Sequence, residues 1–178
     1  MSTLEQVITS AMKVCLKLLL EPEPCNKFIS RHQLSNIANV YESLERESPD
    51  VIIGILSAFI TRQVVRGEFS KDAAKEIIQT LYKLKELDID NFKRNVREFL
   101  SILLWLYESL EKCVIENRRF KKCMDGCIGE ERKGKERKRF RECVHQCLAE
   151  INLAKKLSEV SNIVEFVQIL LDECKSYT

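Results

Sequence analysis

The chain has 178 residues, which is enough for one domain with an appendage and for a hydrophobic core that needs no crosslink. Its 29 Lys and Arg residues nearly balance its 27 Asp and Glu residues, and the net charge of +2 does not by itself indicate a polyanionic partner. The longest apolar run, residues 51–60, is too short to cross a bilayer, and the polar first residues are unlike a signal peptide. We therefore expect a soluble, cytoplasmic protein with no membrane partner.

Apolar residues recur at helical spacing along the whole chain, without a competing strand pattern, and this predicts an all-α fold. The first predicted helix stops at Pro22, and later ones cover residues 30–44, 49–66, 70–84, 90–110, 136–157 and 161–174. Ser30 with Gln33 has capping-box spacing, Ser48 precedes a first-turn Pro49, and Ser70 caps the fourth helix. The prediction is a compact helical bundle over residues 1–112, followed over 113–178 by a helical hairpin and a closing C-terminal helix packed on the bundle.

The predicted third helix, residues 49–66, is apolar on most faces until its end, so we expect it at the centre of the bundle. Arg62 and Arg66 lie one turn apart just before Gly67, which is the expected helix terminator. Cations at this position offset the helix dipole, which is one explanation for them. The other is a rim that contacts phosphates.

The predicted fifth helix carries the aromatic residues Trp105 and Tyr107. No alternation of basic and aromatic residues surrounds them, as a base-stacking platform would require. We expect both side chains to pack in the core. This helix is expected to continue through Cys113 towards Cys123.

Two Cys-x3-Cys pairs stand fifteen residues apart, Cys123 with Cys127 and Cys143 with Cys147. Positions i and i+4 share a helix face, so each pair forms a two-thiol stripe. If the chain reverses within residues 126–134, the two helices run antiparallel and the stripes meet. We expect a disulfide ladder that joins Cys123 to Cys147 and Cys127 to Cys143.

The alternative for these four cysteines is a zinc site with four thiolate ligands, since ligands on successive helical turns can share a metal. No other metal or cofactor is expected. His145 points away from Cys143 and Cys147 on its helix, so we expect it to be exposed rather than a ligand.

The remaining cysteines suggest two further bridges, although a sequence does not determine connectivity. Cys15 and Cys25 would tie the first helix to the loop after it. Cys113 and Cys174 would join the C-terminus to the base of the hairpin.

Eight cysteines are unusual in a protein that is not exported, because cytosolic thiols normally stay reduced, except in hyperthermophiles. The composition agrees with this exception, since 31% of residues are charged and only five are Gly. We therefore expect a source among thermophilic archaea, their viruses or their plasmids.

Charge is segregated along the chain. Residues 118–141 contain eleven basic and four acidic residues, a charge of +7 that leaves −5 for the rest of a chain whose total is +2. Flexible cations of this kind neutralise phosphates without reading sequence, which predicts salt-dependent binding of nucleic acid. The alternative is a solvated turn whose acidic residues pair with its cations. The candidate contacts near the turn are Arg132, Lys133, Lys135, Arg137, Lys138 and Arg139.

Features of an enzyme are scarce: there are two histidines, no Gly-rich phosphate loop and no His-Glu metal motif. We expect a binding protein without catalytic activity and without a small-molecule substrate. Two functions are open, a nucleic-acid-binding subunit and a disulfide-stabilised module that binds an acidic protein partner in a multi-subunit complex.

The segment from Ser30 to Leu110 has a Ser-x-x-Gln-Leu start at Ser30, a helix that ends in residues 58–63, and a late helix over residues 99–107. In this succession it resembles the small helical subunit of type III CRISPR effector complexes. It implies a helical bundle that holds an RNA backbone with Lys and Arg, so RNA is expected rather than DNA. By this resemblance, Arg62 and Arg66 would contact that backbone.

The spacing of residues 123–147 also resembles the twin Cys-x3-Cys chaperones of the mitochondrial intermembrane space. Those chains consist of little but the hairpin, whereas a whole bundle precedes it here. The resemblance implies a shared helical geometry and not a shared function.

Overall fold

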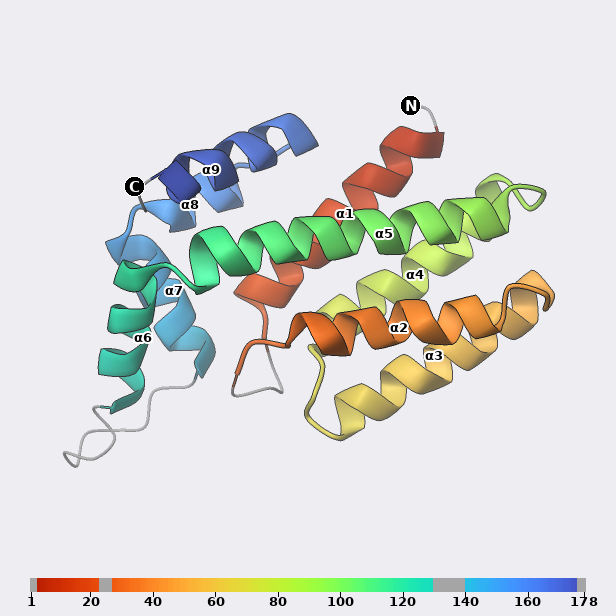
Figure 1. Cartoon of the computed structure of the whole chain (residues 1–178), viewed down its shortest axis with the longest axis horizontal. Helices are drawn as coiled ribbons and strands as arrows, with labels where there is room; N and C mark the ends of the chain where they lie inside the picture. Colours follow the sequence, from red (N-terminus) through yellow and green to blue (C-terminus); the bar gives the residue numbers. More distant parts are fainter. Residues whose placement is uncertain (1–2, 23–26, 130–139, 176–178) are drawn as a thin grey trace. The chain divides into compact units, whose positions relative to one another are not determined.

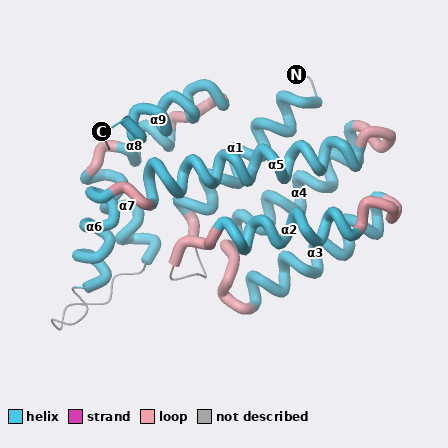
Figure 2. Tube along the Cα trace, viewed as in Figure 1, coloured by secondary structure: helices cyan, strands magenta, loops and turns pink. Residues whose placement is uncertain are grey.

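A computed structural model describes residues 3–22, 27–129 and 140–175, and these ranges contain helices joined by short loops, with no strand (Figure 2). The all-α prediction is confirmed. The chain divides into two compact units, residues 1–107 and residues 108–178. The division falls inside a helix, five residues before the boundary expected from the sequence.

Unit 1 contains α1 (Thr3–Leu20), α2 (Arg31–Ser43), α3 (Pro49–Val65), α4 (Lys71–Leu87) and most of α5 (Phe92–Leu110) (Figure 1). Helix α4 packs against both α1 and α3, and α2 packs against α3. The core of unit 1 is built from the inward stripes of these helices, whose largest fully buried side chains include Leu18, Leu19, Ile37, Tyr41, Ile52, Ile53, Phe92, Phe99 and Tyr107. Phe69, in the loop between α3 and α4, is also fully buried.

Local capping explains where several of these helices begin. The Ser30 hydroxyl accepts a hydrogen bond from the Gln33 amide, and the Gln33 side chain accepts one from the Ser30 amide. Ser70 caps α4 through the Ala73 amide, and Pro49 occupies the first turn of α3. Gly67, with φ of 68°, ends α3 in the left-handed conformation that glycine tolerates best. These four boundaries were predicted from the sequence.

Two buried tyrosines fix α5 within unit 1. The Tyr41 hydroxyl donates to the Lys93 carbonyl at 2.6 Å, and the Tyr107 hydroxyl donates to the Ile29 carbonyl at 2.6 Å. Each bond satisfies a polar group that burial would otherwise leave unpaired. The expectation that Tyr107 packs in the core is confirmed.

The prediction that α3 lies at the centre of the bundle is wrong. Only its face with Ile52, Ile53, Leu56 and Ile60 is buried, against α2 and α4. Its other face is exposed, because within unit 1 the described helices pack on one side of α3 only.

The expectation for Trp105 is also wrong, since this side chain is 67% exposed. Trp105 lies two residues from both Leu103 and Tyr107, which face the core. A displacement of two residues turns a side chain by about 200° around a helix, so Trp105 points away from the buried stripe.

Unit 2 continues from α5 through a π-helical turn, η1 (Glu111–Ile115), into α6 (Arg118–Gly129). It then contains α7 (Phe140–Glu150), α8 (Leu153–Ser158) and α9 (Ile163–Lys175). Helices α6 and α7 pack together, α8 packs on α7, and α9 packs on α8 and η1.

Two predicted helices of this region are interrupted. The fifth helix does not run on into the hairpin, because Asn117 breaks it: its side-chain oxygen accepts the Arg119 and Phe120 amides and starts α6 afresh. The second arm does not run unbroken to Leu157, because Asn152 adopts φ of 60° and separates α7 from α8.

No helix in the described parts of the chain has both the length and the apolar character needed to cross a membrane.

Candidate nucleic-acid interface

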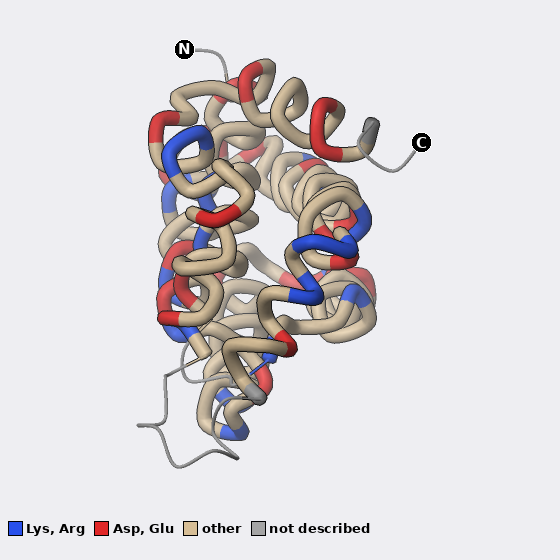
Figure 3. The backbone as a smooth tube through the Cα atoms, turned by 90° about the vertical axis from the view of Figure 1, so that its left-hand side faces the viewer, with Lys and Arg blue, Asp and Glu red and all other residues tan. Residues whose placement is uncertain are grey.

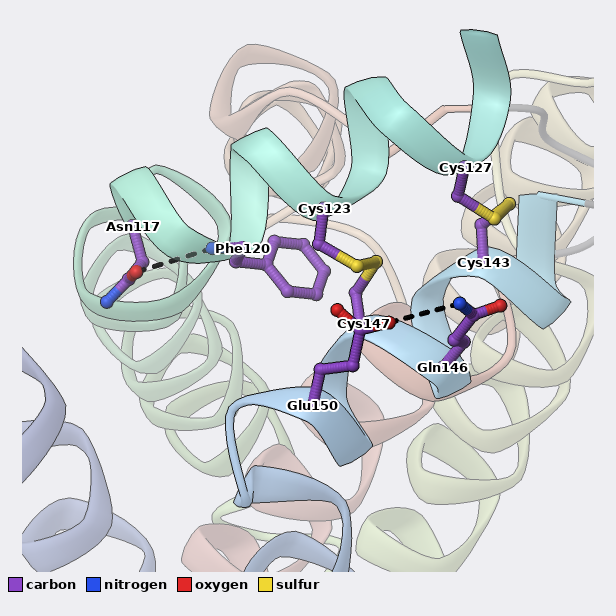
Figure 4. The surroundings of a disulfide bond; sticks show 8 residues. All are labelled: Asn117, Phe120, Cys123, Cys127, Cys143, Gln146, Cys147 and Glu150. Atoms are coloured by element: carbon purple, nitrogen blue, oxygen red, sulfur yellow. Dashed lines mark hydrogen bonds between the residues drawn. A yellow bond between two sulfur atoms is a disulfide. The ribbon is translucent and has the colours of Figure 1, made fainter. Parts of the chain in front are cut away.

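Two disulfides clamp α6 against α7. Cys123 bonds to Cys147 with their Cα atoms 5.6 Å apart, and Cys127 bonds to Cys143 with their Cα atoms 5.8 Å apart (Figure 4). Both Cα distances are typical of disulfides. The residue nearer the start of α6 pairs with the one nearer the end of α7, so the helices are antiparallel, and the predicted ladder is confirmed.

Apolar side chains fill the space beside the clamp. Phe120 and Met124 on α6, and Val144 and Leu148 on α7, are buried on the same sides of their helices as the cysteines. Figure 4 shows the Phe120 ring on the side of α6 that faces the Cys123–Cys147 bond. The hairpin therefore has a small core of its own. Because one side of α6 and one side of α7 are buried in this core, the opposite sides of both helices face outward.

The other cysteines behave in two ways. Cys113 bonds to Cys174, with a Cα–Cα distance of 4.6 Å, and ties η1 to α9, as predicted. Cys15 is a buried free thiol, so it does not take part in the predicted Cys15–Cys25 bond. Its side chain lies on the inward stripe of α1, between Ala11 and Leu18, whereas Cys25 lies outside the described residues.

The zinc alternative requires four thiolates, whereas the structure pairs the same four sulfurs as two disulfides. Within residues 3–22, 27–129 and 140–175, no three His, Cys, Asp or Glu side chains gather around a possible metal position. His145 is exposed on α7, as expected.

Four cations lie exposed on the first half of α6. Figure 3 marks the positions of Lys and Arg along the backbone in blue. We name these four cations of α6 the basic arm: Arg118, Arg119, Lys121 and Lys122. None of them forms an ion pair within the described residues, where the first carboxylate that follows on α6 is Asp125. Their charges are therefore available to a partner in solution.

The basic arm is placed where a helix gains nothing from cations. The first turn of a helix carries a partial positive charge, and cations there, here Arg118 and Arg119, are mildly unfavourable, by about 0.3–1 kcal/mol each at low ionic strength. Lys121 and Lys122 follow in the second turn, where the dipole neither favours nor opposes them. Asn117 satisfies the first amides of α6, but it is neutral and does not compensate this charge. Helix stability does not explain the basic arm, so a charged ligand is the better explanation.

The six candidate contacts predicted near the turn, Arg132, Lys133, Lys135, Arg137, Lys138 and Arg139, lie outside the described residues. They fall in the segment 130–139, which follows the end of α6 and precedes the start of α7 in the sequence. This segment adds six basic and three acidic residues to the hairpin.

Arg62 and Arg66 lie in unit 1, at the end of α3. Both are exposed, and Arg66 is partly neutralised by Glu68 at 3.2 Å. Here the structural explanation is sufficient, because the end of a helix favours cations. These two arginines therefore differ from the basic arm in two ways. They belong to unit 1 and not to unit 2, and they lie at the end of a helix and not at its start.

The members of the basic arm were missing from the predicted contacts, although they belong to the same run of charge. The position of Asn117 could have identified them, because Asn is a preferred N-cap residue and this one directly precedes two arginines. A helix that starts there places Arg118 and Arg119 in its first turn, where cations oppose the helix dipole.

No family model, curated protein or solved structure matches the chain. Function is therefore inferred mainly from the geometry of the hairpin.

Proposed function

We propose that this protein binds the backbone of nucleic acid through its disulfide-clamped hairpin and has no catalytic role. The observation that carries the proposal is the basic arm, in which four exposed cations without ion pairs among the described residues stand in the first half of one helix, two of them in its electropositive first turn. Phosphates are the ligand class that such a surface attracts most strongly.

The clamp contributes by fixing the helix that bears the cations. With α6 bonded to α7 at two successive turns, the backbone of the basic arm loses little conformational entropy when a ligand binds. The side chains remain long and mobile, which suits contacts to phosphates and not the reading of bases. The proposal is therefore for weak sequence specificity.

RNA is the proposed ligand, and this choice depends on the resemblance to the small subunit of type III CRISPR effector complexes. Within that proposal, the protein would act as one subunit of a larger complex, and Arg62 and Arg66 of unit 1 would add backbone contacts where α3 is free of a second copy of the chain.

The test replaces the basic arm with glutamines, R118Q, R119Q, K121Q and K122Q together. Retention of labelled single-stranded RNA on a filter at low salt should fall by about tenfold or more, because the cations that bind phosphates are gone. A matched control replaces four exposed cations of α1 and α4, K13Q, K71Q, K75Q and K83Q, and changes the net charge equally. The control should bind as the wild type does.

Equal losses in both variants would show that net charge acts and that the hairpin is not the site, which would contradict the proposal. Wild-type protein that retains no RNA or DNA, but copurifies with an acidic protein after nuclease treatment, would instead support the interaction-module alternative. Equal retention of RNA and DNA would contradict the choice of RNA, which depends on the CRISPR resemblance. The proposal of backbone binding by the basic arm would still hold.

A further inference from the structure

Helix α3 has apolar residues on two faces, but within unit 1 the described residues cover only one of them. The outer face exposes Val51 by 41%, Ile55 by 43% and Val65 by 82%. A helix that is apolar all round is normally buried all round. The outer face of α3 therefore fits a surface that a partner covers.

These outer residues form a single ridge. Val51, Ile55, Ala58, Arg62 and Val65 follow one another at intervals of three and four residues, and Val51, Ile55, Ala58 and Val65 are all exposed or partly exposed apolar groups. Ala58, at the middle of the ridge, carries the smallest side chain of the set. Two helices that meet there can approach each other closely.

Gly54 provides an independent observation on the same face. Glycine inside a helix lowers its stability relative to alanine, so a reason for it is expected. Unit 1 offers none, because a Cβ atom at Gly54 would meet nothing within 4 Å. Gly54 is exposed and lies one turn before Ala58, so the missing side chain leaves room for something that packs on this face.

We propose that two copies of this chain associate through α3, antiparallel, about a two-fold axis near Ala58. In this register Ala58 meets its own counterpart, Val51 meets Val65, and Gly54 meets Arg62 of the second copy. A two-fold interface must be self-complementary, and this ridge has that property: an apolar valine stands at each end, Val51 or Val65, and the small Ala58 stands at the centre.

Charge decides the direction of the two helices. Asp50 stands at the start of α3 and its side chain is 75% exposed even though it pairs with Lys85. Arg62 stands near the end of α3, exposed and without an ion pair among the described residues. In antiparallel packing, Arg62 of one copy lies opposite Gly54 of the second copy and therefore within one turn of the second copy's Asp50. In parallel packing, Asp50 would lie beside Asp50 and Arg62 beside Arg62, so like charges would repel.

Sedimentation equilibrium of the full chain tests this proposal. The wild type should be a dimer at micromolar concentration, and Ala58→Glu should raise its dissociation constant by about tenfold or more, because two carboxylates meet on the axis. Leu87→Glu is the control, since Leu87 is 47% exposed on α4, outside the ridge. It should leave the dimer intact.

Two further variants separate association from folding. Asp50→Arg and Arg62→Asp should each weaken the dimer, and both changes in one chain should restore it, because the pair is reciprocal across the axis. Gly54→Ala should weaken the dimer but raise the melting temperature of the dilute monomer. A wild type that stays monomeric, or a dimer indifferent to Ala58→Glu, would overturn the proposal.

Discussion

Cys15 shows how burial decides the chemistry of a single residue. The side chain is fully buried in α1, and burial raises the pKa of the Cys15 thiol, because the thiolate cannot be solvated there. The thiol therefore stays protonated at neutral and moderately alkaline pH. Since thiolate is the reactive form, Cys15 is chemically inert in the folded protein.

We predict that native protein leaves Cys15 unlabelled by iodoacetamide at pH 8, whereas the same protein labels it after denaturation without reductant. Peptide mass spectrometry gives both results. The six bonded cysteines are the internal control, because they should become labelled only after reduction. Rapid native labelling of Cys15 would contradict its burial, and bound zinc without disulfides would support the thiolate alternative.

Residues that act through their immediate neighbours were the most predictable. Ser30 and Ser70 begin helices because their hydroxyls accept hydrogen bonds from the amides of the first turn. Ser48 was expected to cap α3 in the same way, but its side chain makes no capping hydrogen bond, and the following Pro49 favours the helix start instead. Cys15 and Trp105 depend on what packs around them. An apolar or aromatic residue on a helix has the same local pattern whether its neighbours cover it or not.

At the scale of elements, the hairpin was predictable because cysteine spacing and helix geometry leave one compatible antiparallel pairing. The helix breaks were harder to predict, because Asn117 and Asn152 are only mildly unfavourable inside a helix and a periodic pattern continues through them. Asn117 caps the start of α6, which its place directly before two arginines could have indicated. The left-handed backbone of Asn152, which separates α7 from α8, is seen only in three dimensions.

The Cys127–Cys143 bond should be a main support of the hairpin. It closes a separation of 16 residues, for which chain entropy alone predicts about 3 kcal/mol of stabilisation. We predict that Cys127→Ala with Cys143→Ala lowers the free energy of unfolding by less than this, about 1–2 kcal/mol, because the enclosing Cys123–Cys147 bond still closes the loop. Urea denaturation followed by circular dichroism measures this quantity.

The matched control is the same comparison in reductant. There the wild type also lacks the bond, so the difference between the two proteins should shrink to the small contribution of packing. A difference of equal size in oxidised and reduced protein would show that the bond does not stabilise the hairpin.

At the scale of the molecule, two surfaces distinguish this chain from an ordinary helical bundle. Arg118 and Arg119 of the basic arm oppose the dipole of their own helix, and the outer face of α3 is apolar and exposed among the described residues of unit 1. Each costs stability in the isolated chain, and each is explained by a partner. The apolar character of α3 was visible in the sequence, but its position at the edge of unit 1 depends on how five helices pack.

If the basic arm contacts phosphates, the salt dependence of RNA affinity should show it most directly. The logarithm of the affinity for single-stranded RNA should fall linearly with the logarithm of salt concentration. Glutamines at all four positions of the basic arm should reduce that slope by about 0.7 for each phosphate that is no longer neutralised, or about 3 in total. An unchanged slope in this variant, or no slope in the wild type, would contradict phosphate binding by the basic arm.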